Sequence, residues 1–146
     1  MIVVTGGAGF IGSAIAQELN MRGRMDLLIV DDIDHPEKEK NITSIKYQEL
    51  RGKNSFLEKI LDRNINSIEV IIHMGACSST TETDEKFLIK NNYHYTRHLA
   101  TYALEKNIRF IYASSAATYG NGEMGYSDDE SKLNTLKPLN LYGESK

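Results

Sequence analysis

The feature that most constrains the fold of this chain is a glycine-rich string close to its start. Residues 5–12 read Thr-Gly-Gly-Ala-Gly-Phe-Ile-Gly and follow the β-branched run Ile2–Val4. Glycine accepts a positive φ and lets two backbone segments approach closely, so such a string suits a tight turn. Apolar residues at helical spacing follow it, at Ile11, Ala14, Ile15 and Leu19. The sequence therefore predicts a strand, a tight turn and a helix in that order.

The remainder of the chain repeats this alternation of short β-branched runs and longer segments of helical period. Such alternation is typical of a parallel sheet with helices packed on it, which is the α/β class. Five strands are predicted, over Ile2–Val4, Asp26–Val30, Ser44–Leu50, Glu69–His73 and Arg109–Ala113. The second, fourth and fifth of them carry continuous apolar runs, so we expect these three to be buried on both faces.

The segments between these strands are predicted as helices or loops. One helical face carries Leu88, Asn92, Tyr95, Leu99 and Tyr102. A shorter helix is predicted over Phe56–Arg63. The stretches Asp32–Thr43 and Gly120–Lys137 hold turn formers and charges without periodicity, so we expect loops there.

Composition excludes several classes of protein. The chain has 146 residues, and 17 Lys and Arg against 20 Asp and Glu give a net charge of −3, so there is no basic surplus for nucleic acid. Its one cysteine, Cys77, excludes an intrachain disulfide framework. The opening apolar run is too short for a signal peptide or a membrane span. We therefore expect a cytoplasmic protein with no membrane or nucleic-acid partner and no bound metal.

The glycine string also indicates a phosphate-binding turn. Gly6, Gly9 and Gly12 lie between a predicted strand and a predicted helix, whose free N–H groups attract a pyrophosphate. Asp31 lies nineteen residues beyond Gly12, at the end of the second strand, where an acid accepts hydrogen bonds from adenosine ribose. Together these features predict a dinucleotide site on a Rossmann-type doubly wound sheet. The alternative is a tight turn that binds no ligand.

The residues near Asp31 leave the choice of dinucleotide open. Asp31 and Asp32 would repel the 2′-phosphate of NADP, whereas Lys38, Lys40 and Lys53 could offset that charge. Local chemistry alone favours NAD, and NADP stays possible.

A second constellation lies towards the end of the chain. Ser115 follows the fifth predicted strand, and Tyr142 and Lys146 follow Pro138 at a spacing that places them on one face of a helical turn. A neighbouring cation lowers the pKa of a phenol, so Tyr142 could act as a base, and Ser115 could hydrogen-bond the same substrate oxygen. The alternative is an ordinary surface turn of a helix.

With these motifs the chain resembles the nucleotide-sugar epimerases and dehydratases of the extended short-chain dehydrogenase/reductase superfamily. The strings Gly75–Glu82, Asn91–Tyr93, Ala113–Gly120 and Pro138–Asn140 resemble more narrowly the ADP-L-glycero-D-manno-heptose 6-epimerase family. The resemblance runs from Met1 to Lys146. It implies an isomerase of lipopolysaccharide core-sugar synthesis that acts on ADP-heptose with NADP, through transient oxidation to a 6-ketone.

The resemblance also implies roles for individual residues. Tyr142 is the implied proton acceptor, Lys146 binds the nicotinamide ribose, and Ser115 completes the catalytic set. The implied cofactor-binding residues are Gly6, Gly9, Phe10, Ile11, Gly12, Asp31, Asp32, Lys38, Lys53, Met74, Gly75, Ala76, Cys77, Ser78, Asn91 and Lys146. The segment around Lys38 and the residue Met74 depart from the family's usual pattern.

The resemblance implies further chain beyond Lys146. We expect residues 1–146 to be the dinucleotide-binding Rossmann domain, truncated before the last strands and the substrate domain, inactive alone and part of a homo-oligomer at full length. Two alternatives stay open. One is another nucleotide-sugar epimerase or dehydratase, although Ala116 and Ala117 stand where a dehydratase carries Asp-Glu. The other is a catalytically inactive NAD(P)-binding module.

Overall fold

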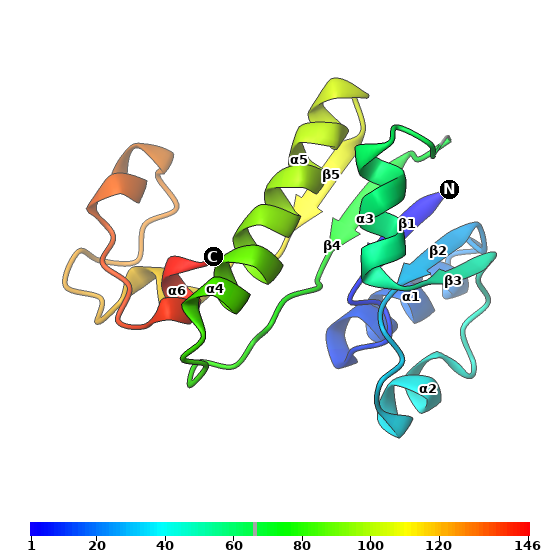
Figure 1. Ribbon diagram of the computed structural model, residues 1–146, viewed down its shortest axis with the longest axis horizontal. Helices are drawn as coiled ribbons and strands as arrows, with labels where there is room; N and C mark the ends of the chain where they lie inside the picture. Colours follow the sequence, from blue (N-terminus) through cyan, green and yellow to red (C-terminus); the bar gives the residue numbers. More distant parts are fainter. Residues whose placement is uncertain (66) are drawn as a thin grey trace. The chain divides into compact units, whose positions relative to one another are not determined.

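The strands form one parallel sheet. The computed structural model describes residues 1–65 and 67–146, and its strand order is β3-β2-β1-β4-β5 (Figure 1). The strands are β1 (Ile2–Thr5), β2 (Leu27–Val30), β3 (Glu49–Arg51), β4 (Val70–His73) and β5 (Arg109–Tyr112). The predicted parallel α/β fold is therefore confirmed, although the third strand begins at Glu49 and is shorter than expected.

The described residues pack into two compact units. The first unit contains Met1–Ala76 and Thr96–Ala113, and with them the whole sheet. The second unit contains Cys77–Tyr95 and Ser114–Lys146. The glycine-rich string lies in the first unit, and Ser115, Tyr142 and Lys146 lie in the second.

The register of the sheet brings the carboxyl ends of its three central strands to one level. Thr5, at the end of β1, pairs with Val30 of β2 and with His73 of β4. The turns that follow these strands therefore start side by side, at the edge where parallel sheets bind ligands.

Burial along the strands follows their place in the sheet. β1 and β2 are buried throughout, because each has a strand on both sides and side chains packed on both faces. The expectation that the fifth strand is buried on both faces is wrong, since Ile111 is 42% exposed. β4 alternates between buried and half-buried residues, so it is only partly as expected. Within residues 1–146 β5 pairs with β4 alone, and its side chains are exposed or half-buried.

Helix α1 (Phe10–Met21) confirms the predicted helix, but its predicted apolar face is only partly buried. Gly12 and Ala16 are its buried residues, whereas Ile11 is 62% exposed. Ala16 belongs to the apolar cluster that covers one face of the sheet, and Leu19 packs against that cluster. Small residues let α1 approach the sheet closely, so they replace the larger apolar ones at the contact.

The opposite face of the sheet is buried as well. Val3, Leu28 and Ile71 point to that face and are fully buried. Figure 1 shows α3 (Lys53–Leu61) and α5 (Tyr95–Glu105) on the side of the sheet away from α1. Phe56 and Ile60 are the buried residues of α3, which covers most of the predicted helix Phe56–Arg63.

The loop predicted over Asp32–Thr43 is wrong for most of its length, because α2 (Pro36–Ile42) forms there. The His35 ring accepts a hydrogen bond from the backbone N–H of Glu37, and Pro36 occupies the first turn, where its missing N–H has no cost. Ile42 is buried in the core. Pro36 followed by acidic residues was a readable start signal for this helix.

The helical face predicted from five spaced residues is confirmed. Leu88, Asn92, Tyr95, Leu99 and Tyr102 are all buried. They lie on α4 (Glu85–Leu88), on a π-helical segment, η1 (Ile89–His94), and on α5. The Asp84 carboxylate accepts a hydrogen bond from the N–H of Phe87 and so caps the start of α4.

The remainder of the second unit contains three short helical turns joined by loops. These turns are η2 (Ala116–Tyr119), η3 (Glu130–Thr135) and α6 (Leu141–Glu144). The loop predicted over Gly120–Lys137 is thus interrupted by η3, whose start Asp129 caps. The helical turn predicted at the end of the chain is confirmed by α6, where the Asn140 side chain accepts a hydrogen bond from Gly143 N–H at 2.8 Å.

Candidate functional site

The glycine-rich turn connects β1 to α1 in the first unit. Gly6 has a φ of +65°, and a Cβ there would lie 2.7 Å from the backbone nitrogen of Gly75. A Cβ at Gly12 would overlap the carbonyl oxygen of Gly6. Glycine is therefore required at both positions. At position 6 it leaves room for the loop that contains Gly75, and at position 12 it lets the first turn of α1 lie against Gly6. The first N–H groups of α1 have no partner within the helix, so they suit an anion.

Two large apolar side chains at the start of α1 face solvent. Phe10 is 87% exposed and follows Gly9, which caps the helix without a side-chain hydrogen bond. Ile11 is exposed too. These are the two residues that the family resemblance places along a pyrophosphate.

Asp31 is bound to the glycine-rich turn. One of its carboxylate oxygens accepts a hydrogen bond from the backbone N–H of Ala8 at 3.0 Å. The other accepts from Asp32 N–H at 2.9 Å and from the Lys38 ammonium at 3.0 Å. Asp31 therefore sets the distance between the end of β2 and the glycine-rich turn, in addition to any contact with a ligand.

Lysines accompany both predicted acids. The Lys38 ammonium lies 2.8 Å from a carboxylate oxygen of Asp34, besides its contact with Asp31. Burial lowers the pKa of Lys38, but its hydrogen bonds to Asp34 and Asp31 outweigh burial and raise it overall. Asp32 accepts a hydrogen bond from the backbone N–H of Lys53 at 3.0 Å, and its other oxygen lies 3.6 Å from the Lys53 ammonium. The negative charge of this edge is thereby largely compensated.

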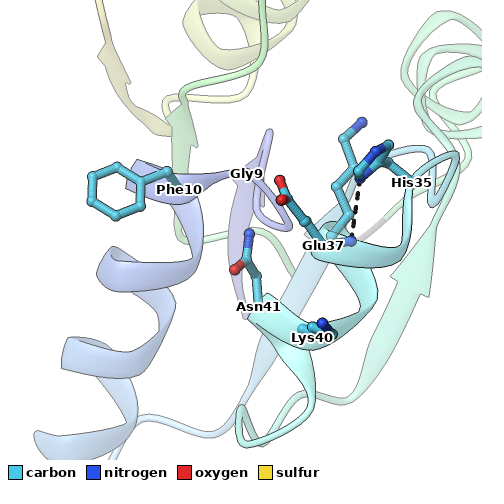
Figure 2. A pocket seen from close by; sticks show the side chains of 7 residues that line it. Gly9, Phe10, His35, Glu37, Lys40 and Asn41 are labelled. Atoms are coloured by element: carbon cyan, nitrogen blue, oxygen red, sulfur yellow. Dashed lines mark hydrogen bonds between the residues drawn. The ribbon is translucent and has the colours of Figure 1, made fainter.

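A pocket of about 400 Å³ opens between α2 and the start of α1 (Figure 2). Its lining residues are Gly9, Phe10, His35, Glu37, Lys38, Lys40 and Asn41. The Asn41 side chain donates a hydrogen bond to the Ala8 carbonyl at 2.9 Å and so ties α2 to the glycine-rich turn. Two lysines against one carboxylate give the pocket lining a basic character, and one of these lysines, Lys38, is also paired with Asp31 and Asp34. His35 and Asn41 were not among the predicted site residues, because α2 was not predicted.

The loop after β4 lies against the glycine-rich turn. The N–H of Met74 donates to the Thr5 carbonyl at 3.0 Å, and the N–H of Gly75 donates to the Thr5 hydroxyl at 3.3 Å. That hydroxyl also bonds to Nδ1 of His73, whose Nε2 bonds to the Thr96 hydroxyl at 2.8 Å. His73 is thus a buried histidine with both ring nitrogens hydrogen-bonded. The structure brings Met74 and Gly75 to Gly6, as expected for one ligand edge.

In the second unit Asn92 holds the continuation of this loop. Its Oδ1 accepts a hydrogen bond from Cys77 N–H at 2.8 Å, and its Nδ2 donates to the Cys77 carbonyl at 3.0 Å. Asn91, the residue predicted to support a cofactor, donates from its side chain to Asn92 at 3.1 Å. Sequence reasoning placed Asn92 on the buried face but gave it no role. An amide among apolar positions of a buried face was the signal that could have found it.

The three predicted catalytic residues belong to the second unit. The Ser115 hydroxyl accepts a hydrogen bond from the Ala117 N–H at 3.2 Å and caps η2. The helix that carries Tyr142, α6, packs against η2, and a Cβ at Gly143 would lie only 2.7 Å from the Ala117 carbonyl oxygen. Lys146 is half-buried, and this burial lowers its pKa. Because η2 packs closely on α6, the segment that Ser115 caps lies next to the helix that carries Tyr142.

Two features that a membrane or metal partner would require are absent from the described residues. No helix within residues 1–65 and 67–146 combines the length and apolar character needed to cross a membrane. Across the same residues, no three or more His, Cys, Asp or Glu side chains gather as ligands of a metal ion would.

A glycine-rich turn between a central parallel strand and a helix, with an acid at the end of the next strand, defines a Rossmann-type nucleotide-binding fold. The model of the NAD dependent epimerase/dehydratase family matches residues 2–146, and the chain belongs to that family. The superfamily inferred from the motifs is thereby confirmed.

The relatives agree with the narrower resemblance. A Fusobacterium nucleatum subsp. nucleatum protein named ADP-L-glycero-D-manno-heptose-6-epimerase is 52% identical over the whole chain, which covers 45% of that relative. A Brachyspira hyodysenteriae protein of the same name is 48% identical over the whole chain, which covers 46% of it. The chain thus spans about half the length of these relatives.

Solved structures show the same fold. The crystal structure of Helicobacter pylori ADP-L-glycero-D-manno-heptose-6-epimerase matches 99% of this chain and 46% of its own, with a TM-score of 0.80 and 28% identity. UDP-glucuronic acid 4-epimerase from Bacillus cereus, solved in complex with NAD, matches 99% of this chain and 48% of its own, with a TM-score of 0.76 and 30% identity. The expected nicotinamide cofactor agrees with this family.

Proposed function

We propose that the full-length protein epimerises ADP-D-glycero-D-manno-heptose at C6 to the L-glycero form, with NADP, for lipopolysaccharide core biosynthesis. Relatives at 52% and 48% identity over this whole chain carry the name of that 6-epimerase. The observation that carries the proposal is the packing of α6, which bears Tyr142, against the turn that Ser115 caps.

The proposed chemistry assigns one role to each polar group. The Tyr142 phenolate takes the proton of the C6 hydroxyl, and the Ser115 hydroxyl binds the same substrate oxygen. Burial disfavours the positive charge of Lys146 and so lowers its pKa. In the proposal, the negative charge of the Tyr142 phenolate and the positive charge of Lys146 stabilise each other. A bound nicotinamide would supply reversible hydride transfer at C6, with the hydride returning to the other face of the ketone carbon. A second acid/base for the turned ketone is expected outside residues 1–146.

The basic pocket supports NADP as the cofactor. The glycine-rich turn and the first N–H groups of α1 would hold the pyrophosphate, because those N–H groups have no partner within the helix. Lys38 and Lys40, which line the pocket, would meet a 2′-phosphate. Ion pairs of Asp31 with Lys38 and of Asp32 with Lys53 weaken the repulsion that favoured NAD in the sequence.

The proposal is tested with the full-length protein, ADP-D-glycero-D-manno-heptose and NADP, by following the C6 epimer with NMR. Tyr142→Phe removes the proposed base and is expected to lower kcat by about 10²-fold or more. Tyr126→Phe is the matched control, because Tyr126 is an exposed tyrosine of the same unit and should keep the wild-type rate.

Three results would contradict the proposal. Full epimerase activity in Tyr142→Phe would remove Tyr142 as the base. Turnover of a UDP-hexose with none of ADP-heptose would indicate another epimerase of the family. Tight binding of NADP without turnover of any nucleotide sugar would indicate an inactive binding module.

A further inference from the structure

The second unit contains a buried pair of polar side chains that the proposed chemistry does not use. Asn92 is 1% exposed and Ser145 is 3% exposed. The Asn92 side-chain nitrogen donates a hydrogen bond to the Ser145 hydroxyl oxygen at 2.9 Å, across 53 residues of sequence. A buried polar pair of this kind must be satisfied on all sides, because an unpaired polar group in an apolar interior is destabilising.

Each side chain of the pair also hydrogen-bonds the backbone of another residue. The Ser145 hydroxyl donates to the Tyr142 carbonyl at 2.7 Å, within the last turn of α6. Asn92 binds both backbone groups of Cys77. Hydrogen bonds therefore run without interruption from the backbone of Cys77, through Asn92 and Ser145, to the backbone of Tyr142. All of these residues belong to the second unit.

The amide of Asn92 makes four hydrogen bonds from a π-helical position. Asn92 lies within the π-helical segment η1, whose wider turn is a rare feature that is frequent at functional sites. Its Oδ1 accepts from Cys77 and Asn91, and its Nδ2 donates to Cys77 and Ser145. Both N–H groups of the amide are thus in use. Loss of the Ser145 hydroxyl would leave one of them unpaired in a buried site.

We propose that Ser145 is a positioning residue: through Asn92 it fixes the last turn of α6, and with it Tyr142 and Lys146, to the Cys77 segment. The inference rests on the proposed function, in which Tyr142 is the base and Lys146 its cation. Ser145 touches no reacting atom. It acts because a small displacement of a catalytic group lowers the rate steeply.

Ser145→Ala in the full-length protein tests the inference, with Ser131→Ala as the matched control. Ser131 is an exposed serine of the same unit whose hydroxyl donates to Asp129. We expect Ser145→Ala to lower kcat about tenfold or more while KM for ADP-heptose stays within about threefold of wild type. The acid limb of the kcat profile should move to higher pH, because Lys146 stabilises the phenolate less well.

A second readout does not depend on turnover. Alkylation of Cys77 by iodoacetamide, followed on its peptide by mass spectrometry, reports how firmly Asn92 holds that segment. Ser145→Ala should raise the alkylation rate about threefold or more, whereas Ser131→Ala should leave it unchanged. If wild-type protein does not epimerise ADP-heptose, the proposed function fails, and the alkylation rate alone decides whether Ser145 holds the Cys77 segment.

The inference is overturned by either of two results. One is a Ser145→Ala protein with wild-type kcat and an unmoved pH profile, even if its Tm is lower, since that would be a purely structural effect. The other is an unchanged rate of Cys77 alkylation. If Ser145→Ala does not fold, Ser145→Cys, which keeps the volume but weakens both hydrogen bonds, is judged by the same criteria.

Discussion

The two units of the molecule are stabilised in different ways. The first contains the buried parallel sheet and nearly all of the apolar core, and its glycine-rich turn is shaped by close backbone contacts. In the part of the chain that the structure describes, the second unit contributes only Leu88 and Tyr95 to the buried apolar residues. Its ordering comes from capping and buried polar side chains such as Ser115 and Asn92.

The glycine-rich turn and the proposed catalytic residues therefore depend on different kinds of interaction. A turn set by backbone packing tolerates few substitutions at its contact points but needs few side chains. A site ordered by hydrogen bonds can lose its geometry when a single hydroxyl or amide is removed. We therefore expect substitutions in the first unit to act on folding, and substitutions in the second unit to act on local order and rate.

The largest effect is expected for Gly12→Ala. The added methyl group would overlap the Gly6 carbonyl oxygen, so the glycine-rich turn or α1 must move. The free energy of unfolding should fall by about 3 kcal/mol, as measured by urea denaturation. In Gly23→Ala, the control, the added Cβ meets nothing within 4 Å at a φ of +82°, so only about 1 kcal/mol of conformational destabilisation is expected. Equal losses in the two variants would contradict the close-contact account of the first unit.

The second-largest effect is expected in the basic pocket of the first unit, where the Lys38 side chain is proposed to bind NADP. Lys38→Ala removes a cation that lies beside Asp31 and Asp34. The Kd for NADP should rise about tenfold while the Kd for NAD changes little, as measured by titration calorimetry with each dinucleotide. Lys46→Ala, at an exposed lysine outside the pocket lining, is the control. An equal loss of NAD and NADP affinity would show that Lys38 supports the fold of the turn and does not select the phosphate.

A smaller effect should follow removal of the cap of α6. Asn140→Ala deletes the acceptor for Gly143 N–H and should cost about 1 kcal/mol of local stability. Hydrogen exchange should quicken at α6 and leave the sheet unchanged. Asp129→Ala, which removes the cap of η3, should affect only η3. Exchange that quickened throughout the sheet after Asn140→Ala would mean that the two units do not differ in the way described.

The smallest effect is a pH dependence within the first unit. The hydrogen bond from Arg24 lowers the pKa of Asp26 from 3.8 to about 2. A carboxylate with a lowered pKa contributes stability that is complete above its ordinary pKa and is lost as the pH falls through the lowered value. Thermal unfolding should therefore show a decrease in stability between pH 3.8 and about 2 that is weaker in Asp26→Asn. Identical pH profiles for the two proteins would exclude this contribution.

The sequence revealed those features whose causes are local. Strands, the glycine-rich turn and the buried face from Leu88 to Tyr102 follow from periodicity and from the special geometry of glycine. The exposure of β5 depends on what packs against its two faces, which is a property of the tertiary structure. The link from Asn92 to Ser145 spans 53 residues, so neither residue signals its partner in the sequence. The predicted catalytic spacing of Tyr142 and Lys146 was readable, whereas what holds α6 in place was not.

The account as a whole depends on inversion at C6 by transient oxidation, with Tyr142 as the base. The most direct test is to let the full-length protein epimerise ADP-D-glycero-D-manno-heptose in D₂O and to measure deuterium at C6 of the product by NMR and mass spectrometry. The account predicts that C6 keeps its original hydrogen and contains no deuterium, because that hydrogen is never given to solvent. Deuterium at C6 in each molecule of product would contradict it.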